Sequence, residues 1–360
     1  MAILITGGAG YIGSHMVHRL SDRGGASLVV LDDLSTGFEW AIPAHVPLVK
    51  GNVGDFTTVV DLIRRHSIDT VLHFAASTVV PESVHNPLKY YSNNTANSLI
   101  LLRAATESGV SRFVFSSTAA VYGEGAPSPT PEDAPTAPAS PYGWSKLMTE
   151  RMIQDAANAS GMRFVILRYF NACGADPQLR SGQSTRSATH LIKVAAEAAV
   201  GVRRELEIYG SDYPTPDGTC IRDYVHVADL VEAHALSLDY LAAGGRSHIF
   251  NCGYGRGYSV REVLDSVQRI SGANFVIKIG QRRPGDQPTS IADSRRLRNL
   301  LKWSPRFDDL DTIVRHAIAW EQELTRRAES GARVPDETAG ATAADGIGRD
   351  PILPPRSRRT

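Results

Sequence analysis

ILITGGAGYIG, residues 3–13, is the stretch of sequence that decides the fold. The apolar run Ile3–Thr6 has the length and composition of a buried strand, and a helical pattern starts at Ile12. Glycines between a strand and a helix let the backbone turn tightly and approach a pyrophosphate, whose charge then lies at the helix N-terminus. A purely structural turn also needs glycine, so the interpretation depends on the residues that follow.

An acidic strand end supplies the context that this glycine turn requires. The second expected strand ends in Leu31-Asp32-Asp33, about twenty residues after the glycines, where a carboxylate accepts both hydroxyls of an adenosine ribose. Asp32 selects against NADP, because a 2′-phosphate would meet this carboxylate with no arginine beside it. The pair Asn52-Val53 is placed to reach the adenine ring, or else is an ordinary strand end. The NAD site is predicted at Gly7, Gly10, Tyr11, Ile12, Gly13, Asp32, Asp33, Asn52 and Val53.

The first half of the chain alternates short β-branched runs with segments of helix length. This alternation is typical of a parallel sheet with helices on both faces, and the second half is less regular. We therefore predict an α/β fold: a Rossmann-type doubly wound parallel sheet with a smaller α+β substrate-binding lobe. The expected strands are Ile3–Thr6, Ser27–Asp32, Thr70–His73, Arg112–Ser116, Arg163–Tyr169, His248–Asn251 and Phe275–Ile279, and the expected helices Ile12–Arg23, Phe56–His66, Asn94–Ser108, Tyr142–Ala159, Ala188–Gly201, Ala228–Ala242 and Val260–Ser271.

The domain prediction follows from the same pattern. Residues 1–172 form the NAD-binding domain, with returning segments near 222–252, and residues 173–325 form mainly the second lobe. From residue 329 the chain has few large apolar side chains to offset the entropy of ordering, so residues 329–360 are expected to be a disordered tail.

Composition narrows the class of protein. The 360 residues carry a formal net charge of zero, which gives no reason to expect nucleic acid or an anionic membrane as a partner. No apolar run approaches the roughly 20 residues that cross a bilayer, and Met1 leads directly into the first strand without a signal peptide. The three cysteines are widely spaced and odd in number, which argues against a disulfide framework or a zinc site. We expect a cytoplasmic enzyme without a metal.

Tyr142 and Lys146 are the candidate catalytic pair. They lie four residues apart at the start of an expected helix, so their side chains project from one face. A free tyrosine has a pKa of about 10, and we expect the lysine, together with an oxidised nicotinamide, to lower it. The tyrosine can then take a proton from a sugar hydroxyl. Thr118, just past the end of a strand, is placed to bind the same oxygen. A Tyr-x-x-x-Lys pair alone is common on helix surfaces and gains weight from its order after the glycine turn.

At this point the sequence resembles the extended short-chain dehydrogenases/reductases, and within them the UDP-glucose (UDP-galactose) 4-epimerases. The resemblance runs from Met1 to about Glu323. Its most telling stretch is YGSDYPTPDGTCIRDYVHV, residues 209–227. The other segments that carry it are residues 7–15, 31–34, 73–76, 87–94, 140–146, 167–171 and 282–286, with Gly174.

The resemblance implies a role for each matching residue. Tyr142 matches the acid/base, Lys146 its partner and nicotinamide-ribose ligand, and Thr118 the substrate-oxygen hydroxyl. Two arginines, Arg222 and Arg283, also make independent sense, because fork-shaped donors suit the oxygens of a diphosphate. Further matches are Phe74, Ala75, Ala76, Asn93, Ser116 and Phe170 for the cofactor, and Asn171, His190, Leu191, Tyr209, Arg222, Arg283, Asp286 and Ser290 for the UDP-sugar; Asp223 and His226 are interpreted as structural.

Four positions depart from the family pattern. Thr118 replaces a serine, and Thr78 stands where some members place a lysine that faces the cofactor. His190 replaces an asparagine, so it is either a substitute donor or a merely packed histidine. Ser290 stands beside the expected C2 substituent of the sugar, where members that reject N-acetylated sugars tend to have a tyrosine. Serine there predicts room for UDP-N-acetylhexosamines.

The activity implied is an NAD-dependent UDP-glucose/UDP-galactose 4-epimerase that oxidises the sugar transiently at C4, with NAD held tightly and not consumed. A homodimer is a further expectation from the family. A 4,6-dehydratase is disfavoured, because it needs an Asp-Glu pair where Ala119-Ala120 stand. A 4-epimerase of UDP-glucuronate or UDP-xylose stays open, and a non-catalytic NAD-binding protein is the alternative of another class, disfavoured because Tyr142 and Lys146 are both present.

Overall fold

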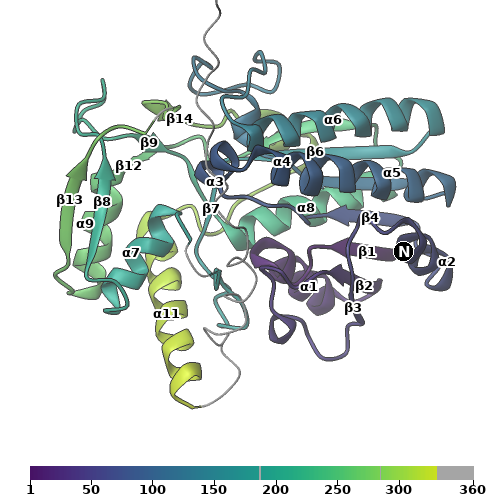
Figure 1. Ribbon diagram of the computed structural model, residues 1–360, viewed down its shortest axis with the longest axis horizontal. Coiled ribbons are helices and arrows are strands. Elements are labelled where there is room, and N and C mark those ends of the chain that lie inside the picture. The colour runs from purple at the N-terminus through teal and green to yellow at the C-terminus, as the bar shows by residue number, and fades with distance from the viewer. Residues whose placement is uncertain (186–187, 284, 331–360) are drawn as a thin grey trace, which may run out of the picture.

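A seven-stranded parallel sheet forms the centre of the larger part of the molecule (Figure 1). The computed structural model describes residues 1–185, 188–283 and 285–330, so the predicted disordered tail lies outside the described residues from 331 onward. All six pairings in the sheet are parallel. In spatial order the strands are β3 (Leu48–Lys50), β2 (Ser27–Asp32), β1 (Ala2–Thr6), β4 (Thr70–His73), β5 (Arg112–Ser116), β6 (Arg163–Tyr169) and β11 (His248–Cys252).

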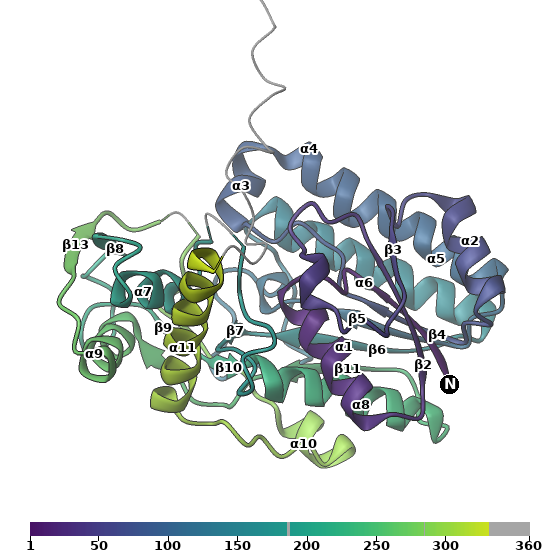
Figure 2. The ribbon, with the colours of Figure 1, turned by 90° about the horizontal axis from the view of Figure 1, so that it is seen from below.

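Helices cover both faces of this sheet, and β1 shows why. Ile3 and Ile5 point into the core beneath α1 (Tyr11–Arg23) and α8 (Val227–Ala242), whereas Leu4 points into the core on the opposite face. All three side chains are fully buried. The opposite face is covered by α2 (Phe56–Arg65), α5 (Asn97–Glu107) and α6 (Pro141–Ser160), as Figure 2 shows from below. The predicted doubly wound α/β fold is confirmed.

The strand order reverses between β1 and β4, and this reversal positions the site. From β1 the chain moves outward to β2 and β3, then crosses back to place β4 on the other side of β1. Loops leaving the carboxyl ends of the two central strands therefore part in opposite directions and open a crevice, which is where open α/β sheets bind ligands.

Two predicted helices begin three residues later than expected. The helix predicted at Ala188–Gly201 is α7 (Leu191–Ala199), and the second case is α5. The prediction was Asn94–Ser108, but α5 starts at Asn97 and residues Tyr91–Ala96 form a π-helical turn. The wider turn frees the Asn94 side chain to accept from the Ser77 backbone N–H (2.8 Å) and to donate to Ser145 Oγ (3.0 Å). Such turns often occur at functional sites, because they redirect side chains out of the regular ladder.

The second lobe lies beside the carboxyl ends of the sheet (Figure 1). A parallel pair, β8 (Glu205–Tyr209) and β13 (Val276–Gly280), packs with α7 (Leu191–Ala199) and α9 (Val260–Ser271). A small sheet joins β9 (Ile221–Arg222) to β12 (Tyr258–Ser259) and β14 (Thr289–Ser290). The other elements are the pair β7 (Asn171–Cys173) and β10 (Tyr224–His226), and the helices α3 (Val80–His85), α4 (Pro87–Tyr90), α10 (Arg295–Leu301) and α11 (Leu310–Glu329).

The sequence analysis made expectations about membrane helices, disulfides and metal sites, which can be compared with the described residues. None of the helices within 1–330 is long and apolar enough to cross a membrane. Cys173, Cys220 and Cys252 are all buried free thiols. Across the described ranges, no group of three or more His, Cys, Asp or Glu side chains is arranged to hold a metal ion.

The buried ion pair between Arg168 on β6 and Glu150 on α6 generates a prediction about stability. Arg168 Nη2 lies 2.6 Å from Glu150 Oε2, and both side chains are shielded from water. We expect Arg168→Met to lower the free energy of unfolding by about 3–5 kcal/mol, because it leaves a buried carboxylate uncompensated. The control is Arg151→Met, which removes an exposed ion pair with Asp155 on the same helix and should change stability by less than about 1 kcal/mol. Equal effects in urea unfolding would contradict this account.

Candidate active site

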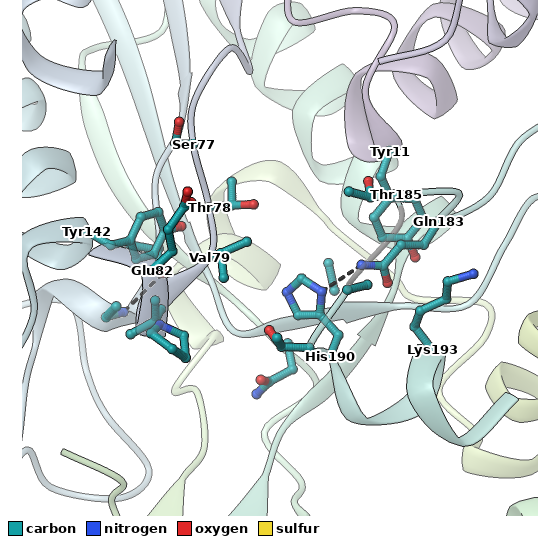
Figure 3. Close-up of a pocket in the computed structure, with 18 of the residues that line it drawn as sticks. Tyr11, Ser77, Thr78, Val79, Glu82, Tyr142, Gln183, Thr185, His190 and Lys193 are labelled. Carbon is teal, nitrogen blue, oxygen red and sulfur yellow. Dashed lines mark hydrogen bonds between the residues drawn. The ribbon is translucent and has the colours of Figure 1, made fainter. Parts of the chain in front are cut away.

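A single cavity of about 1250 Å³ lies between the carboxyl ends of the sheet and the second lobe. It is larger than the roughly 300–1,000 Å³ typical of a pocket for one small ligand, so it has room for two. Every residue predicted for the site lines this cavity, except Lys146, which is buried one turn after Tyr142 on α6. Figure 3 shows Tyr142 and Thr78 on one side of the cavity and Tyr11, His190 and Gln183 on the other. The strand ends contribute Gly7 after β1, Asp32 at the end of β2, Phe74 after β4, Thr118 after β5 and Phe170 after β6.

The glycine turn, residues 7–13, leaves no space for side chains where the backbone is closest. A Cβ on Gly13 would lie 2.1 Å from the Gly7 carbonyl oxygen, and Gly7 has φ +69° with the Ala75 backbone against it. Among the described residues no side chain caps the start of α1, where Gly10 is the N-cap. The first N–H groups of α1 are thus available to an anion, at the positive end of the helix dipole.

Asp32 lies beside this turn and is fixed by backbone donors. Its two carboxylate oxygens accept from the N–H groups of Ala9 (2.9 Å) and Leu34 (2.8 Å). Burial raises its pKa, and these two hydrogen bonds oppose the rise. Each oxygen keeps a further lone pair, which a ribose diol can use. Asp33 is exposed and accepts from the Ser35 N–H instead.

Two other predicted cofactor contacts are already engaged with the backbone. Tyr11 Oη donates to the Gly174 carbonyl (2.7 Å), which ties the start of α1 to the loop after β7. Asn52 Oδ1 accepts from the Gly54 N–H (2.7 Å), so its amide group is held at the cavity wall. These bonds fix the shape of the wall and leave the aromatic ring and the amide nitrogen facing a ligand.

The catalytic candidates lie together, and both are buried. Burial raises the pKa of Tyr142, and a hydrogen bond with Thr118 opposes the rise. Lys146 Nζ donates to the Ser116 carbonyl (2.9 Å), and burial lowers its pKa to about 7 against the attraction of Glu150. The protein's own side chains therefore do not lower the pKa of Tyr142. The other contribution that the sequence analysis expects is the positive charge of a bound nicotinamide, which would favour the phenolate.

His190 is held by a residue that the sequence did not single out. Gln183 Nε2 lies 2.6 Å from His190 Nδ1, and His190 is an exposed residue that lines the cavity. Because an amide nitrogen only donates, Nδ1 accepts in this arrangement and the proton of a neutral ring lies on Nε2. His190 is also the N-cap residue of α7, which carries Leu191 at its first position. Its role as a donor to the nucleotide stays a prediction. No sequence signal points to Gln183, since it lies in an irregular loop.

The polar residues of the second lobe gather around Arg222. Its guanidinium donates to the Gln287 carbonyl (2.7 Å) and to Asp286 Oδ1 (3.3 Å). Ser290 on β14 is paired in register with Arg222 on β9, so the two residues are neighbours. The Arg283 guanidinium lies 3.5 Å from the centre of the Tyr209 ring.

Asp223 holds the loop that presents Arg222. Its carboxylate accepts from the backbone N–H groups of Tyr254 (2.8 Å), Gly255 (2.9 Å) and Ala292 (3.1 Å). Its own carbonyl accepts from Asn171 Nδ2 (3.2 Å). Burial raises the pKa of Asp223 to about 6, with the backbone donors opposing the rise. These contacts agree with a structural interpretation of Asp223.

The sequence pattern of the NAD dependent epimerase/dehydratase family matches residues 3–253. The chain belongs to this family. Within it, the chain is 56% identical over 322 residues to a UDP-glucose 4-epimerase of Azospirillum brasilense, covering 89% of this chain and 92% of that one. The resemblance inferred from the sequence is confirmed.

Two solved structures of relatives have the same fold. UDP-glucose 4-epimerase from Brucella ovis in complex with NAD aligns with TM-score 0.85 and 42% identity, over 88% of this chain and 97% of that one. The UDP-Glc/GlcNAc 4-epimerase from Campylobacter jejuni aligns with TM-score 0.79 and 45% identity, over 89% and 99%. These two relatives thus share the overall fold of this chain.

Proposed function

We propose that this protein is an NAD-dependent UDP-glucose 4-epimerase. The observation that carries the proposal is one cavity that joins three features: the glycine turn with Asp32, the Tyr142–Thr118 pair, and Arg222 with Arg283. The names of the relatives support the same activity. The cavity's size also suits a dinucleotide and a nucleotide-sugar side by side.

The residues of the sheet domain fit NAD. The turn at Gly7 and Gly13 admits no side chain, the start of α1 offers N–H groups to a pyrophosphate, and Asp32 keeps lone pairs for a ribose. Bound NAD⁺ supplies the hydride acceptor and a positive charge that favours the phenolate of Tyr142. The burial of Asp32 near the turn favours NAD over NADP, because a 2′-phosphate would face a carboxylate.

The chain's own residues handle the proton and the sugar. Tyr142 Oη takes the proton of the sugar's 4-hydroxyl and later returns it, and Thr118 orients that oxygen. Arg222 and Arg283 hold the diphosphate, so the 4-keto sugar turns about its diphosphate linkage while the nucleotide stays in place. Hydride then returns to the opposite face of C4. The cycle is redox-neutral, which requires that NAD remain bound throughout.

Removal of the Tyr142 hydroxyl tests this mechanism. We expect Tyr142→Phe to lower kcat for the conversion of UDP-galactose to UDP-glucose by about 10²–10⁴-fold, the usual contribution of a positioned acid/base group. Tyr240→Phe, on α8 outside the cavity lining, is the matched control and should leave kcat unchanged. The mechanism is wrong if Tyr142→Phe converts UDP-galactose at the parental rate.

We also propose that the enzyme accepts UDP-N-acetylhexosamines. Ser290 lines the cavity and is the neighbour of Arg222 in the small sheet, so a small side chain stands close to the expected diphosphate ligand. The Campylobacter jejuni relative is a UDP-Glc/GlcNAc 4-epimerase, which supports the proposal.

A larger residue at position 290 should narrow the substrate range. We expect Ser290→Tyr to reduce kcat/KM for UDP-GlcNAc by at least about 10-fold while UDP-glucose is little affected, because the added ring fills space beside the C2 substituent. Epimerisation of both substrates by the parent and the variant is the measurement. If the parent turns over UDP-GlcNAc several orders of magnitude more slowly than UDP-glucose, the proposal that it accepts UDP-N-acetylhexosamines is wrong.

We infer that the protein forms a homodimer through α5 and α6. These helices pack side by side and expose Leu99, Trp144 and Met148, whose exposed fractions are 52%, 41% and 41%. Large apolar side chains gathered on one face are typical of an interaction surface.

A charge placed in this face should separate the protomers. We expect Met148→Glu to shift the molecular mass measured by light scattering from dimer to monomer, because it introduces a desolvated charge at the contact. Val276→Glu, at an exposed apolar position in the second lobe, is the control and should stay dimeric. A monomeric parent would contradict the inference.

We propose that the protein is located in the cytoplasm. The three buried free thiols, Cys173, Cys220 and Cys252, are consistent with a reducing compartment. Recovery of the native protein from the periplasmic or secreted fraction of its cells would overturn this assignment.

A further inference from the structure

Helix α11 packs against α7 and α9 of the second lobe and lies between α7 and α1 (Figure 2). Its Trp320 is almost fully buried there. A Cβ on Gly182 would lie 2.4 Å from Trp320 Cδ1, so glycine at 182 is what lets the indole enter. Trp320 Nε1 donates to Ser184 Oγ (3.2 Å), and the ring lies 6.0 Å from the ring of Trp40.

One cation contacts both indoles. The Arg327 guanidinium, two turns after Trp320 on α11, lies 5.1 Å from the centre of the Trp40 ring and 5.0 Å from that of Trp320. Arg327 is held in place by bonds to Glu323 (2.7 Å) and to the Leu179 carbonyl (3.0 Å). A guanidinium over an indole face is attracted by the ring's electron density, most strongly where water is partly excluded.

Trp40 belongs to the loop that closes the adenosine side of the cofactor cavity. This loop, residues 33–41, contributes Asp33, Ser35 and Thr36 to the cavity lining. Its Phe38 N–H donates to the Ala9 carbonyl (3.0 Å), and Phe38 stacks on Trp40 with ring centres 5.3 Å apart.

The loop and the glycine turn are locked together as well. A Cβ on Gly37 would lie 2.9 Å from the Ala9 backbone, so the two segments are in close contact. Ala9 in turn donates to Asp32, the predicted ribose ligand. A continuous path of contacts therefore runs from Arg327 on α11, through Trp40 and Phe38, to the glycine turn.

We propose that Trp320 and Arg327 are positioning residues that hold the loop 33–41 down over the adenosine end of bound NAD and so slow its release. This inference rests on the proposed function, because it assigns a role in retaining that enzyme's cofactor. The loop lies outside the sheet and helices apart from one 3₁₀ turn, Glu39–Ala41, and the contact of Trp40 with the residues of α11 is one of its anchors on the side away from the glycine turn. A redox-neutral cycle needs a cofactor that stays bound, and this clamp provides for that without touching the reacting atoms.

The test compares NAD retention in four purified proteins: the parent, Arg327→Met, Arg327→Lys and the control Arg326→Met. Arg326 is the exposed neighbour that shares Glu323 as a partner but contacts neither indole. Each protein is passed through a desalting column at intervals, and the NAD that remains bound is released with acid and quantified. We expect Arg327→Met to lose NAD about tenfold faster than the parent, Arg327→Lys at an intermediate rate because an ammonium keeps some cation–π attraction, and Arg326→Met at the parental rate.

A second readout separates positioning from general damage. With saturating NAD added, Arg327→Met should recover the parental kcat, since Arg327 is not among the residues that line the cavity. Trp40→Leu should lose NAD in the same way, and if that variant does not fold, Arg327→Met decides. Equal retention by the parent and Arg327→Met overturns the clamp, as does equal loss from Arg326→Met. A parent that never retains NAD contradicts the proposed function instead.

Discussion

The close approach of β1 to α1 at the glycine turn is the constraint on which the rest of the structure depends. Gly13 and Gly7 are so near that a single methyl group would collide with a carbonyl oxygen. This contact directs the start of α1 at the crevice between β1 and β4, where the strand order reverses. Ala9 in the same turn fixes Asp32, and Phe38 fixes the loop beyond it. Residues of the sheet domain thus fix the shape of the predicted cofactor site, without a contribution from the second lobe.

Burial is the second organising effect, and it acts on the reacting groups. It raises the pKa of Tyr142, so the phenol favours its neutral form in the protein alone, and it lowers the pKa of Lys146 to about 7, so the ammonium loses its proton more readily than usual. In a site without water, a charged side chain has a large desolvation free energy unless an opposite charge is paired with it. The chemistry therefore depends on the positive charge of the bound cofactor to favour the phenolate. Tight retention of that cofactor is a requirement of the mechanism.

Much of the sheet domain could be predicted from the sequence, because its signals are local. The strands Ser27–Asp32, Thr70–His73, Arg112–Ser116 and Arg163–Tyr169 were predicted with the bounds the structure has. Apolar runs of this kind are buried on both faces and are bounded by turns. The π-helical turn before α5 was not predicted, since its geometry is decided by the partners of Asn94 elsewhere in the fold.

Only part of the candidate site could be predicted from the sequence. Residues in short motifs were found, and the residues predicted to bind ligands, apart from Lys146, line one cavity. Gln183, Trp320 and Arg327 were missed, because their roles arise from contacts between segments far apart in the chain. The lowering of the Tyr142 pKa, which depends on bound NAD⁺, stays a prediction. The burial that opposes it could not be predicted, because a sequence shows spacing and not the depth of burial. The domain boundaries and the individual roles of the site residues stay predictions.

The most direct test of the central claim is incubation of the purified protein with UDP-galactose and no added NAD, with products separated by anion-exchange chromatography. The account predicts that UDP-glucose forms until the two sugars reach equilibrium, while the amount of protein-bound NAD stays constant. Absence of conversion despite bound NAD, or conversion that consumes NAD in proportion to the sugar, would contradict it.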